Sequence, residues 1–263
     1  MRLAVAQTAG VSGDPDATLN QLDGLAGDAA AQGARLLVLP EMWLTGYNIA
    51  DQTTALAEPA DGPSARRIAE LAQRHRLAIL YGFPERADGT VFNAGQLIAA
   101  DGTVLARYRK AHLFGAAERA QFTPGDTVTA SCTLDGLRLA ILICYDVEFP
   151  EAVRAAVLAG ADAVLVPTAL FQPFGFVVTH LVPVRAWENG VYVVYANRCG
   201  AERELTYVGG SVVVAPDGEV VTATGDGPDL LLADLAAAPV AAARERNPYL
   251  QDRRPDLYGT GSG

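Results

Sequence analysis

The order of predicted strands and helices in this chain repeats once, and this repeat limits the possible folds more than any other feature. Two segments, IAADGTVLARY at 98–108 and VVAPDGEVVTAT at 213–224, can almost be laid over each other. Each is predicted to be a β-hairpin, because two apolar runs meet at an Asp-Gly pair that begins at Asp101 or Asp217. Each hairpin also follows three strands and two helices, so the chain is predicted to consist of two similar halves.

The pattern of apolar residues predicts the same elements in both halves. In the first half it predicts strands at 3–7, 36–40 and 77–83 and helices at 16–33 and 63–76. In the second half it predicts strands at 137–144, 163–169 and 191–198 and helices at 149–160 and 179–189. Strands that alternate with helices form sheets covered by those helices. We therefore predict an α/β fold in which two mixed sheets face each other, with helices on the outer faces.

The whole chain, 1–263, is predicted to form a single domain. Half of its residues are apolar, which supplies a large core, and the segment 110–137 between the halves is not a flexible Gly/Ser linker. The end of the chain has a different character. After a short helical stretch from about Ala236, residues 247–263 contain spaced polar and proline clusters. This composition is typical of an extended arm rather than of a core element.

The net charge argues against a nucleic-acid partner. The formal charge is −10 at pH 7, the pI is about 4.7, and no basic stripe is present, so a polyanion would be repelled. No apolar run approaches the ~20 residues that a membrane-spanning helix needs. The N-terminal segment MRLAVAQTAG reads as a first strand instead of a signal peptide. We expect neither a nucleic-acid nor a membrane partner.

The cysteines indicate reduced thiols. Cys132, Cys144 and Cys199 are odd in number and lack paired spacing, which favours a cytoplasmic location over a disulfide framework. The sequence has no HExxH motif and no paired cysteine ligands, and Gly209-Gly210 lacks the residues that follow in a phosphate loop. We therefore expect no metal and no cofactor.

Three side chains with useful chemistry follow predicted strands, where ligands bind in α/β sheets. LLVLP runs into Glu41, VLARYR into Lys110 and LAILI into Cys144. Lys110 is the only lysine among the 20 Lys and Arg residues, so its position is expected to need a compact ammonium instead of a planar guanidinium. Each residue also has a structural interpretation. Cys144 could be a core thiol, Glu41 a carboxylate at a helix N-terminus, and Lys110 a solvated lysine.

The stretches LPEMWLTGY, YRKAHLFGAAERAQFTPG and LICYDVEFPE resemble the three signature segments of the nitrilase superfamily, the carbon–nitrogen hydrolases. Segment 168–202 is most similar to small bacterial aliphatic and R-stereoselective amidases. The resemblance covers nearly the whole chain. It implies a four-layer α-β-β-α sandwich, the nitrilase fold, and a catalytic triad of Glu41, Lys110 and Cys144. It also implies a second catalytic glutamate at Glu118, and subunits that pair into a homodimer or larger homo-oligomer.

These residue types suit the hydrolysis of an amide. A free thiol is only a few per cent thiolate at neutral pH, so Glu41 is expected to accept its proton if burial raises the pKa of Glu41. Lys110 and the backbone N–H of Tyr145 are expected to bind the developing oxyanion. Glu118 would orient Lys110 or the substrate nitrogen. A Cys–His pair is the rival mechanism, and His112 is the strongest candidate for that role.

The segment TALFQPFGF at 168–176 follows a predicted strand and is expected to line the substrate pocket. The candidate pocket residues are Tyr47, Thr168, Ala169, Phe171, Phe174, Phe176 and Trp187. Such a pocket is aromatic and largely apolar. No Arg or Lys lies between Arg154 and Arg185, which favours neutral carboxamides over substrates with a carboxylate, although Arg185 or Arg198 could reach the pocket.

The sequence therefore predicts an amidase, a hydrolase of carbon–nitrogen bonds other than peptide bonds. It would convert a small neutral carboxamide to the acid and ammonia through a cysteine thioester. A nitrilase or an N-carbamoyl amide hydrolase with the same three residues is the alternative. A non-catalytic interaction scaffold is a third interpretation, disfavoured because Glu41, Lys110 and Cys144 are all present.

Overall fold

Two six-stranded mixed sheets form the centre of the computed structural model, which describes residues 1–50 and 52–258. The first sheet has the order β14 (Asp229–Asp234), β1 (Arg2–Gln7), β2 (Leu36–Val38), β3 (Ala78–Ala87), β4 (Thr90–Ile98) and β5 (Val104–Arg109). The second has the order β13 (Val220–Ala223), β12 (Val212–Val214), β9 (Tyr192–Ala196), β8 (Ala163–Pro167), β7 (Leu137–Ile141) and β6 (Ala130–Leu134). In each sheet three adjacent strands pair in parallel, and each remaining strand pairs antiparallel with its neighbour.

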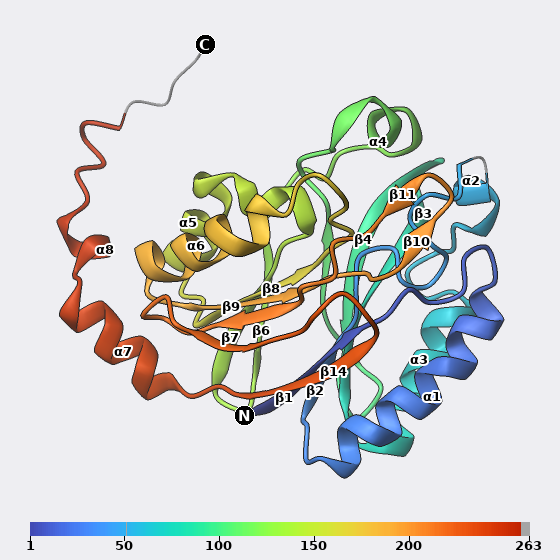
Figure 1. Ribbon diagram of the computed structural model, residues 1–263, viewed down its shortest axis with the longest axis horizontal. Helices are drawn as coiled ribbons and strands as arrows, with labels where there is room; N and C mark the ends of the chain where they lie inside the picture. Colours follow the sequence, from blue (N-terminus) through green and yellow to red (C-terminus); the bar gives the residue numbers. More distant parts are fainter. Residues whose placement is uncertain (51, 259–263) are drawn as a thin grey trace.

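Helices cover the outer faces of both sheets, which gives the predicted four layers (Figure 1). The helices α1 (Pro15–Ala31) and α3 (Pro63–His75) lie on the first sheet, and α5 (Pro150–Leu158) and α6 (Val182–Asn189) on the second. The alternation of strand side chains explains the layering. In β1, Leu3 and Val5 pack into the core that includes the second sheet, whereas Ala4 and Ala6 pack with α1 and α3.

Both predicted hairpins are present, as β4–β5 and β12–β13, and they occupy equivalent outer positions in the two sheets. The edge strands β6 and β14 were not predicted. β14 pairs antiparallel with β1 along Arg2 to Gln7, and so joins the C-terminal part of the chain to its first strand. β6 pairs with β7, the strand that leads toward Cys144.

Two predicted elements end differently in the structure. The strand predicted at 137–144 ends at Ile141, and Cys144 begins a short 3₁₀ helix, η1 (Cys144–Glu148). The helix predicted at 179–189 begins two residues earlier, as a π-helical turn, η2 (Val177–Leu181), and continues as α6. The first difference concerns function, because it places Cys144 on a turn instead of in a strand.

Small elements gather at one end of the sandwich. They are α2 (Gln52–Leu56), α4 (Gly115–Gln121), β10 (Ala201–Glu202) and β11 (Leu205–Thr206), and Figure 1 shows them beyond the ends of the central strands. The carboxyl ends of β2 and β5 point to the same end, because β5 is antiparallel to β4, which is antiparallel to β3. This end of the molecule is therefore where the predicted site residues can meet.

The C-terminal segment after β14 forms α7 (Ala237–Arg246) and the short α8 (Tyr249–Asp252) along the edge of the molecule (Figure 1). α7 packs on the body of the protein, because Val240 joins the core that includes the second sheet and Nη2 of Arg244 donates to the carbonyl of Ala161 at 2.6 Å. Of the arm predicted at 247–263, residues 259–263 lie outside the described residues. Leu257 and Tyr258 are exposed in the described part of the arm. Across 1–50 and 52–258, the helices are all too short or too polar to span a membrane.

Candidate active site

The single lysine of the chain lies between two carboxylates at the end of the sandwich. Lys110 directly follows β5, and its Nζ donates to Oε1 of Glu41 and to Oε1 of Glu118, each at 2.7 Å. Glu41 lies in the loop after β2, and Glu118 lies in α4. Lys110 and Glu41 are fully buried, and Glu118 is buried as well. Two distant parts of the sequence, one around Glu41 and one from Lys110 to Glu118, thus meet in one charged cluster that is closed to solvent.

Glu41 uses only one of its two carboxylate oxygens in this cluster. Oε1 accepts a hydrogen bond from Nδ2 of Asn93 on β4 at 2.7 Å, in addition to the one from Lys110. Oε2 is buried and has no hydrogen-bond partner within the described ranges. The backbone N–H of Glu41 donates to the carbonyl of Thr168 at 3.3 Å, which connects this loop to the second sheet. A fixed carboxylate with one unoccupied oxygen is suited to accept a proton.

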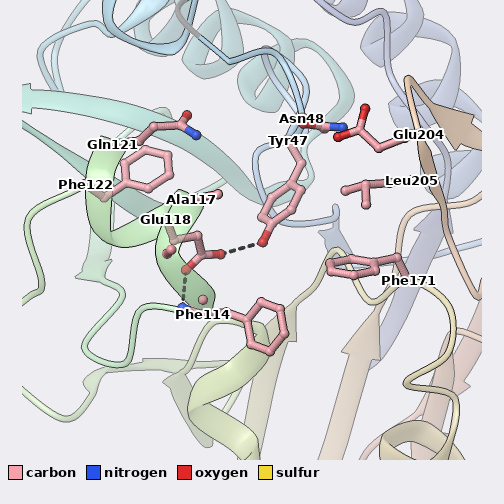
Figure 2. Close-up of a pocket in the computed structure, with 12 residues that line it drawn as sticks. Tyr47, Asn48, Phe114, Ala117, Glu118, Gln121, Phe122, Phe171, Glu204 and Leu205 are labelled. Atoms are coloured by element: carbon pink, nitrogen blue, oxygen red, sulfur yellow. Dashed lines mark hydrogen bonds between the residues drawn. The ribbon is translucent and has the colours of Figure 1, made fainter.

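Glu118 is held by three donors. Its Oε1 accepts from the hydroxyl of Tyr47 at 2.7 Å as well as from Lys110, and its Oε2 accepts from the backbone N–H of Phe114 at 2.7 Å. Figure 2 shows the bonds to Tyr47 and to Phe114. Because both oxygens are occupied, Glu118 is suited to position Lys110 rather than to move protons.

Cys144 begins the 3₁₀ helix η1 with a positive φ of 46°, a strained conformation for a residue other than glycine. Asp146 stabilises this turn from inside. Its Oδ2 accepts from the N–H of Ile143 and the hydroxyl of Tyr108, both at 3.0 Å, and its Oδ1 accepts from the N–H of His112 at 2.9 Å. The N–H of Tyr145 lies in the first turn of η1, where backbone donors have no partner within the helix. The turn thus presents a thiol next to a backbone donor.

The electrostatics of the cluster keep the thiol protonated at rest. Burial raises the pKa of Cys144 well above that of an ordinary thiol, and the Glu41 carboxylate adds to this effect, while Lys110 opposes it. Burial also raises the pKa of Glu41, against the opposing effect of Lys110. Burial lowers the pKa of Lys110, but Glu41 and Glu118 raise it by more, so the net pKa lies well above the ordinary value. Lys110 therefore remains an ammonium, and Glu41 is a stronger base than an exposed glutamate.

A small cavity opens beside the thiol. It is lined by Tyr47, Phe114, Cys144, Tyr145, Glu148, Ala169, Leu170, Phe171 and Phe174. The aromatic rings contact one another edge to face: the centroid of Phe114 lies 5.2 Å from that of Tyr145 and 5.5 Å from that of Phe174. The cavity is thus a small, mostly apolar chamber with the thiol in its wall.

A second, larger cavity adjoins the first and shares the side chains of Tyr47, Phe114 and Phe171 with it. Figure 2 shows Tyr47 and Phe114 near Glu118, with Phe171 and Leu205 of β11 on the other side of this cavity. The shared aromatic residues separate the chamber at Cys144 from the wider outer cavity.

The structure corrects three of the predicted pocket residues. Trp187 lies on α6 away from Cys144 and lines a surface depression with the C-terminal residues Tyr249 and Tyr258. The side chain of Phe176 is exposed and stacks on His180. Thr168 is fully buried and does not line the cavity, although its carbonyl holds the N–H of Glu41. The other predicted pocket residues line the cavity, and they are Tyr47, Ala169, Phe171 and Phe174.

Three residues of the site were not predicted: Asn93, Phe114 and Glu148. Asn93 lies in the middle of β4, a mostly apolar strand in which nothing in the sequence distinguishes Asn93 from Gln96. Glu148 lies four residues after Cys144, so both ends of one short helical turn face the cavity. A helical reading of CYDVE could have found Glu148, but the strand prediction placed it outside the site.

The histidines do not form a pair with the thiol. His112 bonds through Nδ1 to Oδ1 of Asp146 at 2.7 Å and stacks on Phe149, with ring centroids 3.9 Å apart. β5 ends at Arg109, so His112 does not share a strand with Lys110. His112 therefore supports the turn that carries Cys144. Within residues 1–50 and 52–258, no group of three His, Cys, Asp or Glu side chains could hold a metal ion.

Comparison with known proteins agrees with this geometry. The family model described as carbon–nitrogen hydrolase matches residues 2–245. The chain is 49% identical to "Hydrolase in pqqF 5′ region" of Pseudomonas protegens, over 87% of this chain and 81% of that protein. It is 35% identical to an (R)-stereoselective amidase of Pseudomonas sp., over 98% and 93% of the two chains.

A solved amidase of Nesterenkonia sp. AN1 is similar in sequence and in structure. One of its mutants, which shows covalent addition of the acetamide moiety of fluoroacetamide at the active site cysteine, has 38% identity and a TM-score of 0.88, over 98% of this chain and 95% of that one. Another mutant of the same amidase was solved in complex with butyramide and has the same identity, TM-score and coverage.

Proposed function

This chain belongs to the carbon–nitrogen hydrolase family, and from that premise we propose that it is an amidase that converts a small carboxamide without a carboxylate group to the acid and ammonia. One observation carries the proposal. A buried Lys110 lies between Glu41 and Glu118, beside a thiol that opens into a cavity lined by aromatic side chains. The covalent adduct at the active site cysteine of the Nesterenkonia amidase, and its complex with butyramide, support the same chemistry here.

The first step is attack by the thiol on the amide carbonyl. Because the pKa of Cys144 is raised, the thiol holds its proton until substrate is bound, and Glu41 accepts that proton as the sulfur–carbon bond forms. Oε2 of Glu41 is the oxygen available for this transfer. Negative charge then develops on the carbonyl oxygen. Lys110 and the N–H of Tyr145 are the donors that stabilise it.

The second half of the reaction uses the same groups. Glu41 gives the proton to the amide nitrogen, and the carbon–nitrogen bond breaks. Ammonia departs, and the acyl group remains on Cys144 as a thioester. Glu41 then takes a proton from water, whose oxygen attacks the thioester, and the proton passes to the departing sulfur. Glu118 keeps Lys110 in place throughout, because its two oxygens are already held by Lys110, Tyr47 and Phe114. The scheme needs no metal and no cofactor.

The cavity favours an amide over an N-carbamoyl amino acid. Such a substrate carries a carboxylate that needs a fixed cation. The guanidinium of Arg185 donates to the backbone carbonyls of Val147 and Glu148 at 2.9 and 2.7 Å. The guanidinium of Arg198 donates to the backbone carbonyl of Met42 at 3.2 Å. Neither arginine lines the cavity. The carboxylate of Glu148 does line it and would repel an anion.

Ammonia release from a panel of butyramide, butyronitrile and an N-carbamoyl amino acid tests the proposal. The proposal predicts turnover of butyramide above the other two. Turnover of the nitrile above the amide would make the protein a nitrilase, and no ammonia from any small amide would refute the amidase assignment.

The cellular location and the oligomeric state of the enzyme are part of the same proposal. All three cysteines are free, which supports a reducing compartment such as the cytoplasm. We also propose that the chain acts as a homodimer or larger homo-oligomer, with the C-terminal arm as part of the contact.

A further inference from the structure

One side chain of the cavity at Cys144 has no role in the reaction scheme. Glu148 ends the turn that Cys144 begins, and it contributes a carboxylate to a wall that is otherwise aromatic or aliphatic apart from the thiol. Its backbone is fixed, because Nη2 of Arg185 donates to its carbonyl at 2.7 Å and Nε of Arg185 donates to the carbonyl of Val147 at 2.9 Å. The carboxylate is therefore held at a defined place in the chamber that receives the substrate.

Glu148 is bonded through its backbone carbonyl, to Arg185, and in the described part of the protein no side chain forms a hydrogen bond or ion pair with its carboxylate. The guanidinium of Arg185 is engaged elsewhere, with backbone carbonyls and with Oε1 of Glu188 at 3.1 Å. Burial raises the pKa of Glu148, while the charges of Lys110 and Arg185 lower it. A half-buried carboxylate without a direct partner costs free energy, and a cation that enters the cavity would offset this cost.

The rest of the cavity wall is also favourable to a cation. The rings of Phe114, Tyr145, Phe171 and Phe174 line the same chamber, and an aromatic face attracts an ammonium group placed over it. The rings exclude water at the same time, which strengthens a charge pair inside the chamber. A carboxylate among aromatic rings is the combination that recognises a small organic ammonium group.

From this juxtaposition we propose that Glu148 is a specificity-determining residue that binds a substrate ammonium group, so that the preferred substrates are small carboxamides carrying an amine. The inference rests on the proposed amidase function and adds the substrate class. In this arrangement the carboxamide lies at Cys144 and Lys110, and the amine lies against Glu148. Glu148 does not touch the reacting atoms, so its effect is on the binding of charged substrates.

Two amides of nearly the same shape provide the test. β-Alaninamide carries an ammonium group where butyramide carries a terminal methyl group. We expect the wild-type enzyme to show a kcat/KM for β-alaninamide at least about tenfold above that for butyramide, the factor that corresponds to about 1.4 kcal/mol. This comparison needs no variant. Equal values, or a preference for butyramide, would overturn the inference while leaving the amidase function intact.

Glu148→Gln keeps the shape of the side chain and removes its charge. We expect the preference for β-alaninamide over butyramide to fall by about tenfold, mainly through a higher KM for β-alaninamide. Glu151→Gln is the matched control, because Glu151 is exposed in the first turn of α5 and does not line the cavity. The control should keep the wild-type preference.

The remaining outcomes also decide the question. If Glu148→Gln lowers kcat for both amides equally, Glu148 belongs to the chemistry or to the structure of the turn, and the inference is wrong. If the variant keeps the full preference for β-alaninamide, another group binds the amine and the inference is wrong as well. If wild type releases ammonia from neither amide, the proposed amidase function fails first.

Discussion

Replacing Lys110 with arginine separates the need for a positive charge from the need for a compact ammonium. Lys110 is fully buried, and its Nζ lies 2.7 Å from one oxygen of Glu41 and 2.7 Å from one oxygen of Glu118. Lys110→Arg keeps the charge, so the two carboxylates do not lose their counterion. A planar guanidinium, however, is wider than the space between two carboxylates held this closely by Asn93 and Tyr47.

The expected cost can be divided into two parts. The loss of one well-placed oxyanion donor lowers kcat by about 10²–10³-fold, or roughly 3–4 kcal/mol of transition-state stabilisation. Overpacking of a filled buried site lowers the free energy of unfolding by about 1–3 kcal/mol. KM should change less than kcat, because the contact to the oxyanion forms in the transition state and not in the bound amide.

The assay is steady-state ammonia release from butyramide, with circular dichroism and thermal unfolding to verify that the variant is folded. Arg107→Lys is the matched control, since Arg107 lies three residues earlier on β5 with a side chain that is 43% exposed. The control should keep wild-type kcat. A folded Lys110→Arg enzyme with near wild-type kcat would mean that the solitary lysine is an accident of composition and that Lys110 does not bind the oxyanion.

Two further predictions concern pH and assembly. Burial raises the pKa of Glu41, and only its carboxylate form accepts the thiol proton, so kcat/KM should decrease with falling pH around a midpoint above the ordinary glutamate value of about 4.3. A decrease of kcat/KM at acid pH with a midpoint below about 4.3 would contradict this account of Glu41. Because the pKa of Lys110 is also raised, the charge of Lys110 should persist through alkaline pH. Sedimentation at micromolar concentration should show a dimer or larger species, and deletion of residues 247–263 should shift the protein toward the monomer. A 27.6 kDa monomer that is unaffected by the deletion would exclude this assembly.

The sequence was sufficient to predict the layers of the fold and two members of the charged cluster, Glu41 and Lys110, whereas Glu118 followed only from the family resemblance. Continuous apolar strands, the two hairpins and the position of polar residues after strands led to Glu41, Lys110 and Cys144, because the end of a buried strand is set by local sequence. Because Lys110 is the only lysine in the chain, it marked a position that requires a compact ammonium and not merely a positive charge. These signals are local, and they could be read without the structure.

The missed features depend on contacts between distant segments. β14 is recognisable as an edge strand only through its pairing with β1. Trp187 and Arg185 are two residues apart on α6 and therefore face different directions: Arg185 bonds the turn behind Cys144, whereas the ring of Trp187 lies under Arg246 of α7, 5.5 Å from its guanidinium carbon. The sequence gives no indication of which face of α6 meets the site. Glu148 was missed because the strand prediction continued to Cys144 and hid the turn.

The central claim is that Cys144 is the nucleophile, and ammonia release by the three cysteine variants tests it most directly. Cys144→Ala should fold as wild type does, since its residue is buried in a turn held by Asp146, and should release no ammonia from butyramide above the uncatalysed rate. Cys132→Ala and Cys199→Ala should keep most of the activity, because neither thiol lines the cavity. Substantial ammonia release by a folded Cys144→Ala enzyme would contradict the mechanism.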